Sequence, residues 1–171
     1  LARDGGEPGG EHVVVGGDSA GGHLALMLLA KLRAAGLPQP ALAIGLSPWT
    51  DIGRRGESQF GNDRYDMVQG CQTLQYAAWL KGDTGASDAD LSPIHQSYRD
   101  AAPVYLQAGG KEILVDMIRD FAHQLQQQGA ERIVADPGQW PLELHILIAM
   151  LAYSLLALAA VQAVLLAIQD Q

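Results

Sequence analysis

A serine flanked by glycines stands early in the chain, in the run GDSAG at residues 17–21. A short β-branched run at 12–15, typical of a buried strand, precedes it, and a helical pattern over 20–35 follows it. A sharp strand-to-helix turn of this kind strains the serine backbone and lifts its hydroxyl clear of the sheet. The N–H of Ala20 then points into an oxyanion site at a helix N-terminus. The pattern predicts Ser19 as a nucleophile, and the alternative is a glycine-rich turn that only joins strand to helix.

Short apolar runs alternate with helical patterns along the rest of the chain. Four strands are expected, near residues 12–15, 41–46, 104–108 and 131–135, with Gly16-Gly17 as a tight turn after the first. Helices are expected over 20–35, 72–80 and 113–128, and the polar stretches 51–70 and 81–100 are predicted to be mainly loop. This alternation predicts a parallel sheet covered on both faces, within one α/β domain of residues 1–171.

Three blocks, GGDSAGGHLAL, LSPWTD and GGKEILVD, occur in this order and spacing. Together they resemble the bacterial hormone-sensitive lipase family of α/β-hydrolases, from about residue 12 to 145, over the C-terminal half of a typical member. The resemblance implies an α/β-hydrolase fold truncated at the N-terminus, with about four strands and flanking helices. It also implies a serine carboxylesterase that acts on short- and medium-chain acyl esters through an acyl-enzyme, without a metal or organic cofactor.

The same resemblance assigns the catalytic roles. Ser19 falls on the nucleophile, and Glu112, which begins the run EILVD, falls on the acid, with Asp116 one helical turn further as the runner-up. His145 ends the run WPLELH, where the family often reads W-P-G-M-x-H, and so aligns with the base. The alternative for His145 is a histidine in an apolar helix that is paired locally. The order Ser19, Glu112, His145 is the α/β-hydrolase order.

Residues beside the nucleophile are expected to support the site rather than react. His23 lies one helical turn beyond Ser19 and is predicted to face packing, and Trp49 is predicted to pack near the site. Asp18 is expected to hydrogen-bond the backbone of the turn.

Charge and cysteine content limit the other function classes. The chain has 11 Lys and Arg against 19 Asp and Glu, a formal charge of -8, without a basic cluster, which argues against nucleic-acid binding. The single cysteine, Cys71, has no partner for an internal disulfide, and no Cys/His spacing resembles a metal site. The first residues lack the apolar core of a signal peptide, so a cytoplasmic location is expected.

The segment 142–168 carries no formal charge between Leu144 and Ile168. This uncharged stretch is long enough to cross a bilayer as a helix. Because flanking Lys or Arg are missing and a strand-and-loop unit precedes it, a closing helix, buried or packed on a partner, is favoured over a membrane span.

In the resembled family an HGGG run upstream of the nucleophile turn, the nucleophile elbow, completes the oxyanion hole. This sequence has no HGGG run before Ser19, and it begins with Leu1 rather than Met. We therefore expect a fragment, a processed chain or an expression product, whose elbow strand is an exposed edge that recruits a second copy. This leaves a second hypothesis, a catalytically weak or inactive hydrolase fragment that acts as an oligomerisation or interaction module.

Overall fold

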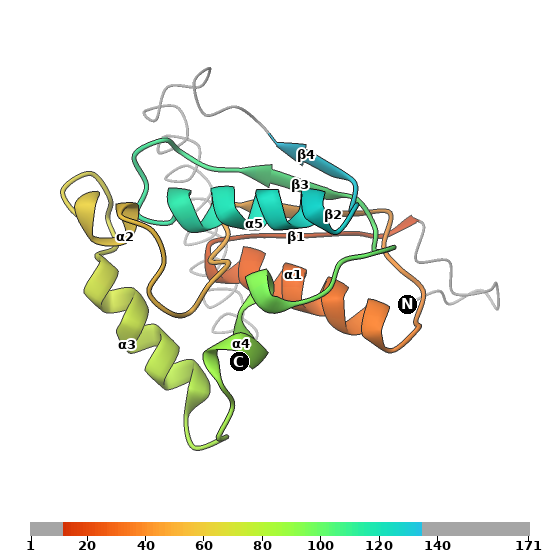
Figure 1. The fold of residues 1–171 in the computed structure, drawn as a ribbon, viewed down its shortest axis with the longest axis horizontal. Coiled ribbons are helices and arrows are strands. Elements are labelled where there is room, and N and C mark those ends of the chain that lie inside the picture. The colour runs from red at the N-terminus through yellow and green to blue at the C-terminus, as the bar shows by residue number, and fades with distance from the viewer. Residues whose placement is uncertain (1–11, 135–171) are drawn as a thin grey trace, which may run out of the picture. The chain divides into compact units, whose positions relative to one another are not determined.

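Four short strands form one parallel sheet in the computed structural model, which describes residues 12–134 (Figure 1). Across the sheet they are β1 (Val14–Asp18), β2 (Leu42–Leu46), β3 (Val104–Gln107) and β4 (Arg132–Val134). The helices in chain order are α1 (Ala20–Ala34), α2 (Ser58–Gly61), α3 (Gly70–Lys81), α4 (Asp88–Leu91), the 3-10 helix η2 (Pro93–His95) and α5 (Val115–Gln127). The predicted α/β fold with a parallel sheet of about four strands is confirmed. Residues 1–11 and the apolar segment 142–168 lie outside the described range.

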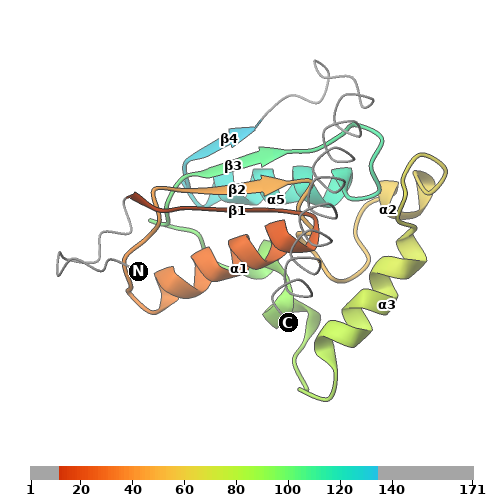
Figure 2. The same ribbon diagram turned by 180° about the vertical axis from the view of Figure 1, so that it is seen from behind.

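The two long helices α1 and α5 pack on the same face of the sheet and share one core. Figure 1 shows α5 in front of the strands, and Figure 2 shows it behind them. Side chains alternate along each strand, so Ala43 of β2 and Val104 and Leu106 of β3 are buried beneath these helices. The helices contribute the residues Leu26, Leu29, Phe121 and Leu125 to this core, all with no exposed surface. Burial of this kind fixes α1, and therefore the turn at its start, to the sheet.

The extent of β1 differs from its prediction. The strand runs through Gly16 and Gly17 to Asp18, because both glycines pair with β2, Gly16 opposite Ile44 and Gly17 opposite Gly45. The predicted tight turn at Gly16-Gly17 is therefore wrong, and the chain turns within a single residue, Ser19.

The burial of this strand was also predicted wrongly. Val13 and Val14 are 51% and 54% exposed. Within residues 12–134 β1 pairs only with β2, so it lies at the edge of the sheet. Val15 pairs with Ala43 on the face that packs against α1 and α5, so Val14 points to the opposite face. The exposed edge expected for the elbow strand is thus present in this part of the chain.

The two polar stretches contain short helices rather than loop alone. The first holds α2, and the second holds α4 and η2. The helix expected over 72–80 begins earlier, at Gly70, because Gln69 and Gln72 form a reciprocal capping box at its start. None of the helices within the described range is both long and apolar enough to cross a bilayer.

The start of α1 lies directly against β1. A Cβ atom on Gly17 would stand 2.2 Å from the backbone carbon of Gly21, whereas a Cβ atom on Gly21 would meet nothing within 4 Å. The strand and the helix can come this close only because residue 17 has no side chain.

Gly17→Ala should therefore lower the free energy of unfolding by about 1–3 kcal/mol or more, since overpacking against backbone cannot be relieved by a rotamer change. Gly21→Ala is the matched control and should leave that free energy unchanged or raise it, because alanine favours a helix over glycine. Urea unfolding followed by circular dichroism measures both variants. Equal stability of the two would show that the close contact is not present in solution.

Candidate active site

Ser19 is the single residue between β1 and α1, and its backbone is strained. Its φ is 53° and its ψ is −113°, in a region that non-glycine residues enter at a cost of about 1–3 kcal/mol. The Ser19 amide donates to the carbonyl of Leu46 (2.9 Å), and the Ser19 carbonyl accepts from the amides of His23 (3.0 Å) and Trp49 (3.1 Å). Hydrogen bonds to β2, to α1 and to the segment after β2 therefore hold the strained conformation.

The serine side chain is available to other molecules. Ser19 is exposed, and its side chain does not cap α1 although it occupies the capping position. Ala20 follows as the first residue of α1, and it is exposed too. The first turn of α1 contains no acidic side chain, so the positive end of the helix dipole is not neutralised there. A negative charge beside Ser19 would be stabilised by this helix N-terminus.

Glu112 and Ser19 both lie beyond the carboxyl ends of their strands, at the same end of the sheet. Ser19 follows β1 and Glu112 lies a few residues beyond β3, and the register aligns Asp18 with Leu46 and Leu46 with Gln107. Because β2 lies between β1 and β3, the ends of these two strands are about 10 Å apart. The predicted base, His145, lies outside the described residues.

The turn that carries Glu112 is held from two sides. The half-buried side chain folds over the end of β3, where a Cβ atom on Gly109 would lie 2.7 Å from Oε1 of Glu112. Asn62 donates from Nδ2 to the Glu112 carbonyl (3.1 Å), and the amide of Ile113 donates to the carboxylate of Asp66 (2.9 Å). Segment 51–70, expected to be a loop, therefore organises the backbone of the candidate acid.

Asp116, the runner-up for the acid, lies in the first turn of α5 as expected. Its carboxylate accepts a hydrogen bond from the Ser58 amide (2.9 Å) and pairs with Arg119 at 3.3 Å. The Ser58 amide is the main reason that the pKa of Asp116 lies below its ordinary value. Asp116 thus joins the start of α2 to α5.

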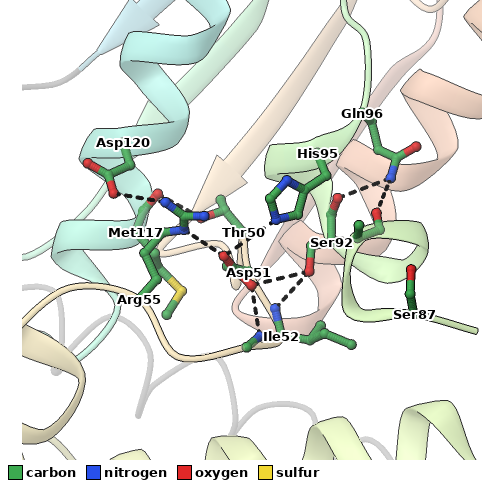
Figure 3. Close-up of polar contacts among 12 residues, drawn as sticks. Thr50, Asp51, Ile52, Arg55, Ser87, Ser92, His95, Gln96, Met117 and Asp120 are labelled. Atoms are coloured by element: carbon green, nitrogen blue, oxygen red, sulfur yellow. Dashed lines mark hydrogen bonds and ion pairs between the residues drawn. The ribbon is translucent and has the colours of Figure 1, made fainter.

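A buried polar network surrounds Asp51, the last residue of LSPWTD (Figure 3). Its carboxylate accepts hydrogen bonds from the Gly53 amide (2.8 Å), from Arg55 Nε (2.5 Å) and from the Ser92 hydroxyl (3.3 Å). Burial by itself would raise the pKa of Asp51, but the hydrogen bonds from Arg55 and Gly53 outweigh it, and the pKa lies below its ordinary value.

This network connects elements that are far apart in the sequence. Arg55 also pairs with Asp120 of α5 at 3.3 Å, and His95 of η2 lies 3.9 Å from the Asp51 carboxylate. Sequence reasoning missed the role of Asp51, and the available signal was its place in LSPWTD. The network joins the segment after β2, which also bonds Ser19, to α5, the helix that follows Glu112.

Two neighbours predicted to pack near the site do so. His23 and Trp49 are 5% and 7% exposed, and their ring centroids lie 5.6 Å apart. Cys71 is an exposed free thiol.

The chain belongs to the α/β-hydrolase fold family, whose profile matches residues 5–140. It is 31% identical over 148 residues to an acetyl-hydrolase of Streptomyces hygroscopicus, covering 85% of this chain and 48% of that protein. It is 30% identical over 117 residues to an esterase of Acinetobacter venetianus, covering 67% and 39%. Among solved structures, an esterase from the bacterial hormone-sensitive lipase family matches with a TM-score of 0.69 and 31% identity.

That structural match covers 74% of this chain and 43% of the esterase. The resemblance to the bacterial hormone-sensitive lipase family, predicted from the three sequence blocks, is therefore confirmed. The chain spans about half, or less, of the length of the relatives that it matches.

The Asp51 network makes a quantitative prediction. Asp51→Asn replaces one carboxylate oxygen with an amide and removes the charge-assisted hydrogen bond to Arg55, so the free energy of unfolding should fall by about 1.5–3 kcal/mol. Asp88→Asn is the control, because Asp88 pairs with Lys81 at 2.6 Å but the two side chains are 47% and 39% exposed. That surface pair should contribute no more than about 1 kcal/mol. Urea unfolding at pH 7 compares them, and equal losses would contradict a buried anchor at Asp51.

Proposed function

We propose that this chain carries the nucleophile and the acid of a serine carboxylesterase that hydrolyses short- to medium-chain acyl esters. The observation that carries the proposal is the strained, exposed Ser19 at the N-terminus of α1. The relatives named acetyl-hydrolase and esterase support the same reaction class. We assign Ser19 as the nucleophile, His145 as the general base and Glu112 as the residue that orients His145.

The reaction would proceed in two stages. His145 takes the proton of the Ser19 hydroxyl while the oxygen attacks the acyl carbon, and the N–H of Ala20 donates to the oxyanion. The tetrahedral intermediate expels the alcohol, which receives its proton from His145, and an acyl-enzyme remains. Water, activated by His145, then releases the acid and restores Ser19. Glu112 fixes the imidazole tautomer and stabilises its protonated form in both stages.

The number of N–H groups that can donate to the oxyanion determines how fast an ester should be turned over. Ala20 provides one N–H at the start of α1, and the sequence contains no HGGG run to provide others. Loss of one oxyanion donor commonly lowers turnover by about 10²–10³-fold. We therefore expect this chain to turn over an ester slowly.

Serine-directed chemistry tests the proposal. The chain should be labelled by an alkyl phosphonate probe and should hydrolyse p-nitrophenyl acetate and butyrate, and Ser19→Ala should abolish both activities. Glu112→Gln should lower turnover by up to about 10⁴-fold, because the imidazole loses its orienting carboxylate. Ser97→Ala, at an exposed serine, is the matched control and should behave like the unaltered chain. Hydrolysis at the same background rate with and without Ser19 would refute an esterase.

A second function, self-association, is favoured by the exposed edge strand β1. Val14 of this strand is about half exposed, as is Val13 just before it, and a strand edge with unpaired backbone groups can pair with another chain. We propose a homo-oligomer that pairs through β1.

Sedimentation velocity over a range of concentrations should show a dimer or a larger species. Val14→Lys, which places a charge on the edge strand, should shift the chain toward monomer. Ile133→Lys alters a residue of similar exposure on the opposite edge strand, β4, and is the control. A monomer at all concentrations would contradict the proposal.

A further inference from the structure

We propose that His23 is a positioning residue for Ser19. The imidazole of His23 hydrogen-bonds the Trp49 carbonyl and so keeps the Trp49 amide hydrogen-bonded to the Ser19 carbonyl. The inference rests on the proposed function of Ser19 as a nucleophile. It extends that function to a residue that the reaction itself does not use.

Three hydrogen bonds link these three residues in a closed ring. The Ser19 carbonyl accepts from the amides of His23 (3.0 Å) and Trp49 (3.1 Å), and Nδ1 of His23 lies 3.0 Å from the Trp49 carbonyl. A carbonyl oxygen can only accept, so Nδ1 of His23 must carry the proton. His23 therefore contacts Ser19 through its main chain and contacts the partner of Ser19 through its side chain.

The surroundings of His23 favour this arrangement. The side chain is 5% exposed and lies against the indole of Trp49, with the two rings tilted by 38°. Burial lowers the pKa of His23, although its hydrogen bond to the Trp49 carbonyl acts in the opposite direction. A neutral imidazole with its proton on Nδ1 satisfies the Trp49 carbonyl without placing a charge in the buried region.

The segment that His23 holds also touches α1 at a neighbouring point. A Cβ atom on Gly22 would stand 2.8 Å from Cβ of Pro48, so the backbone of α1 and the segment after β2 are in direct contact. The hydrogen bond from His23 to the Trp49 carbonyl holds the same segment one residue after Pro48. Without it, the Trp49 amide can withdraw and the strained Ser19 backbone can relax. A nucleophile displaced by about 1 Å can lose up to about 10²-fold in rate.

Two substitutions separate the hydrogen bond from the volume of the side chain. His23→Asn places an amide N–H where Nδ1 stands, whereas His23→Leu fills the space without a donor. We expect His23→Leu to slow phosphonate labelling of Ser19 at least 10-fold, and His23→Asn to stay within about 3-fold of the unaltered chain. Labelling is measured well below the melting temperature of each variant.

A control separates positioning from stability. Leu29→Ala removes a fully buried side chain of α1 that takes no part in the hydrogen bonds among Ser19, His23 and Trp49. This variant should lower the melting temperature without slowing the labelling of folded protein. Labelling of His23→Leu at the unaltered rate would overturn the positioning role. So would a loss of rate in Leu29→Ala as large as that in His23→Leu.

Nuclear magnetic resonance keeps this test separate from the test of the esterase. The ¹⁵N shifts of His23 should report the Nδ1–H tautomer, and the Trp49 amide should exchange at least 10-fold faster in His23→Leu than in His23→Asn. If the unaltered chain is not labelled, the proposed esterase fails, and amide exchange alone decides whether His23 holds Trp49. An Nε2–H tautomer, or equal exchange at Trp49 in the two variants, would overturn the inference.

Discussion

The strained backbone of Ser19 depends on how closely three pieces of chain approach one another. Gly17 lets the start of α1 lie against β1, and Gly22 lets the same helix lie against Pro48. Pro48 also fills the space over Gly45, where a Cβ atom would stand 2.9 Å from its Cγ. The first two sequence blocks, GGDSAGGHLAL and LSPWTD, are therefore the two sides of one contact. The glycines of one side accommodate the proline of the other, and the Ser19 carbonyl is held between them.

The third block, GGKEILVD, is held by polar side chains rather than by close backbone contact. Asn62 and Asp66 bind the backbone around Glu112, and Asp116 binds the start of α2. Asp51 adds a buried carboxylate that reaches α5 through Arg55. The segment between β2 and β3 is thus hydrogen-bonded both to the turn at Ser19 and to the turn at Glu112. Its polar composition reflects these bonds, which a solvated loop would not need.

The described part of the chain presents a strained, exposed serine at the N-terminus of α1, and it leaves β1 at an edge of the sheet. The chain also spans less than half of the length of the esterases that it resembles. A neighbour along β1 would remove the exposed edge and could bring further N–H donors toward Ser19. The two proposed functions, ester hydrolysis and self-association, therefore both involve β1 and the turn that follows it.

The sequence by itself determined the order of strands and helices, the turn at Ser19 and the family, because each depends on local patterns of apolar residues, glycines and short motifs. It did not determine that β1 continues through Gly16 and Gly17, which follows from their pairing with β2, or that Val14 is exposed, which follows from its place on the sheet face opposite α1 and α5. The contacts of Asp51 and His23 were decided only by the tertiary structure. His23 bonds Trp49, 26 positions away, and Asp51 accepts from Ser92, 41 positions away, and no local pattern records which distant partner a buried polar side chain will meet.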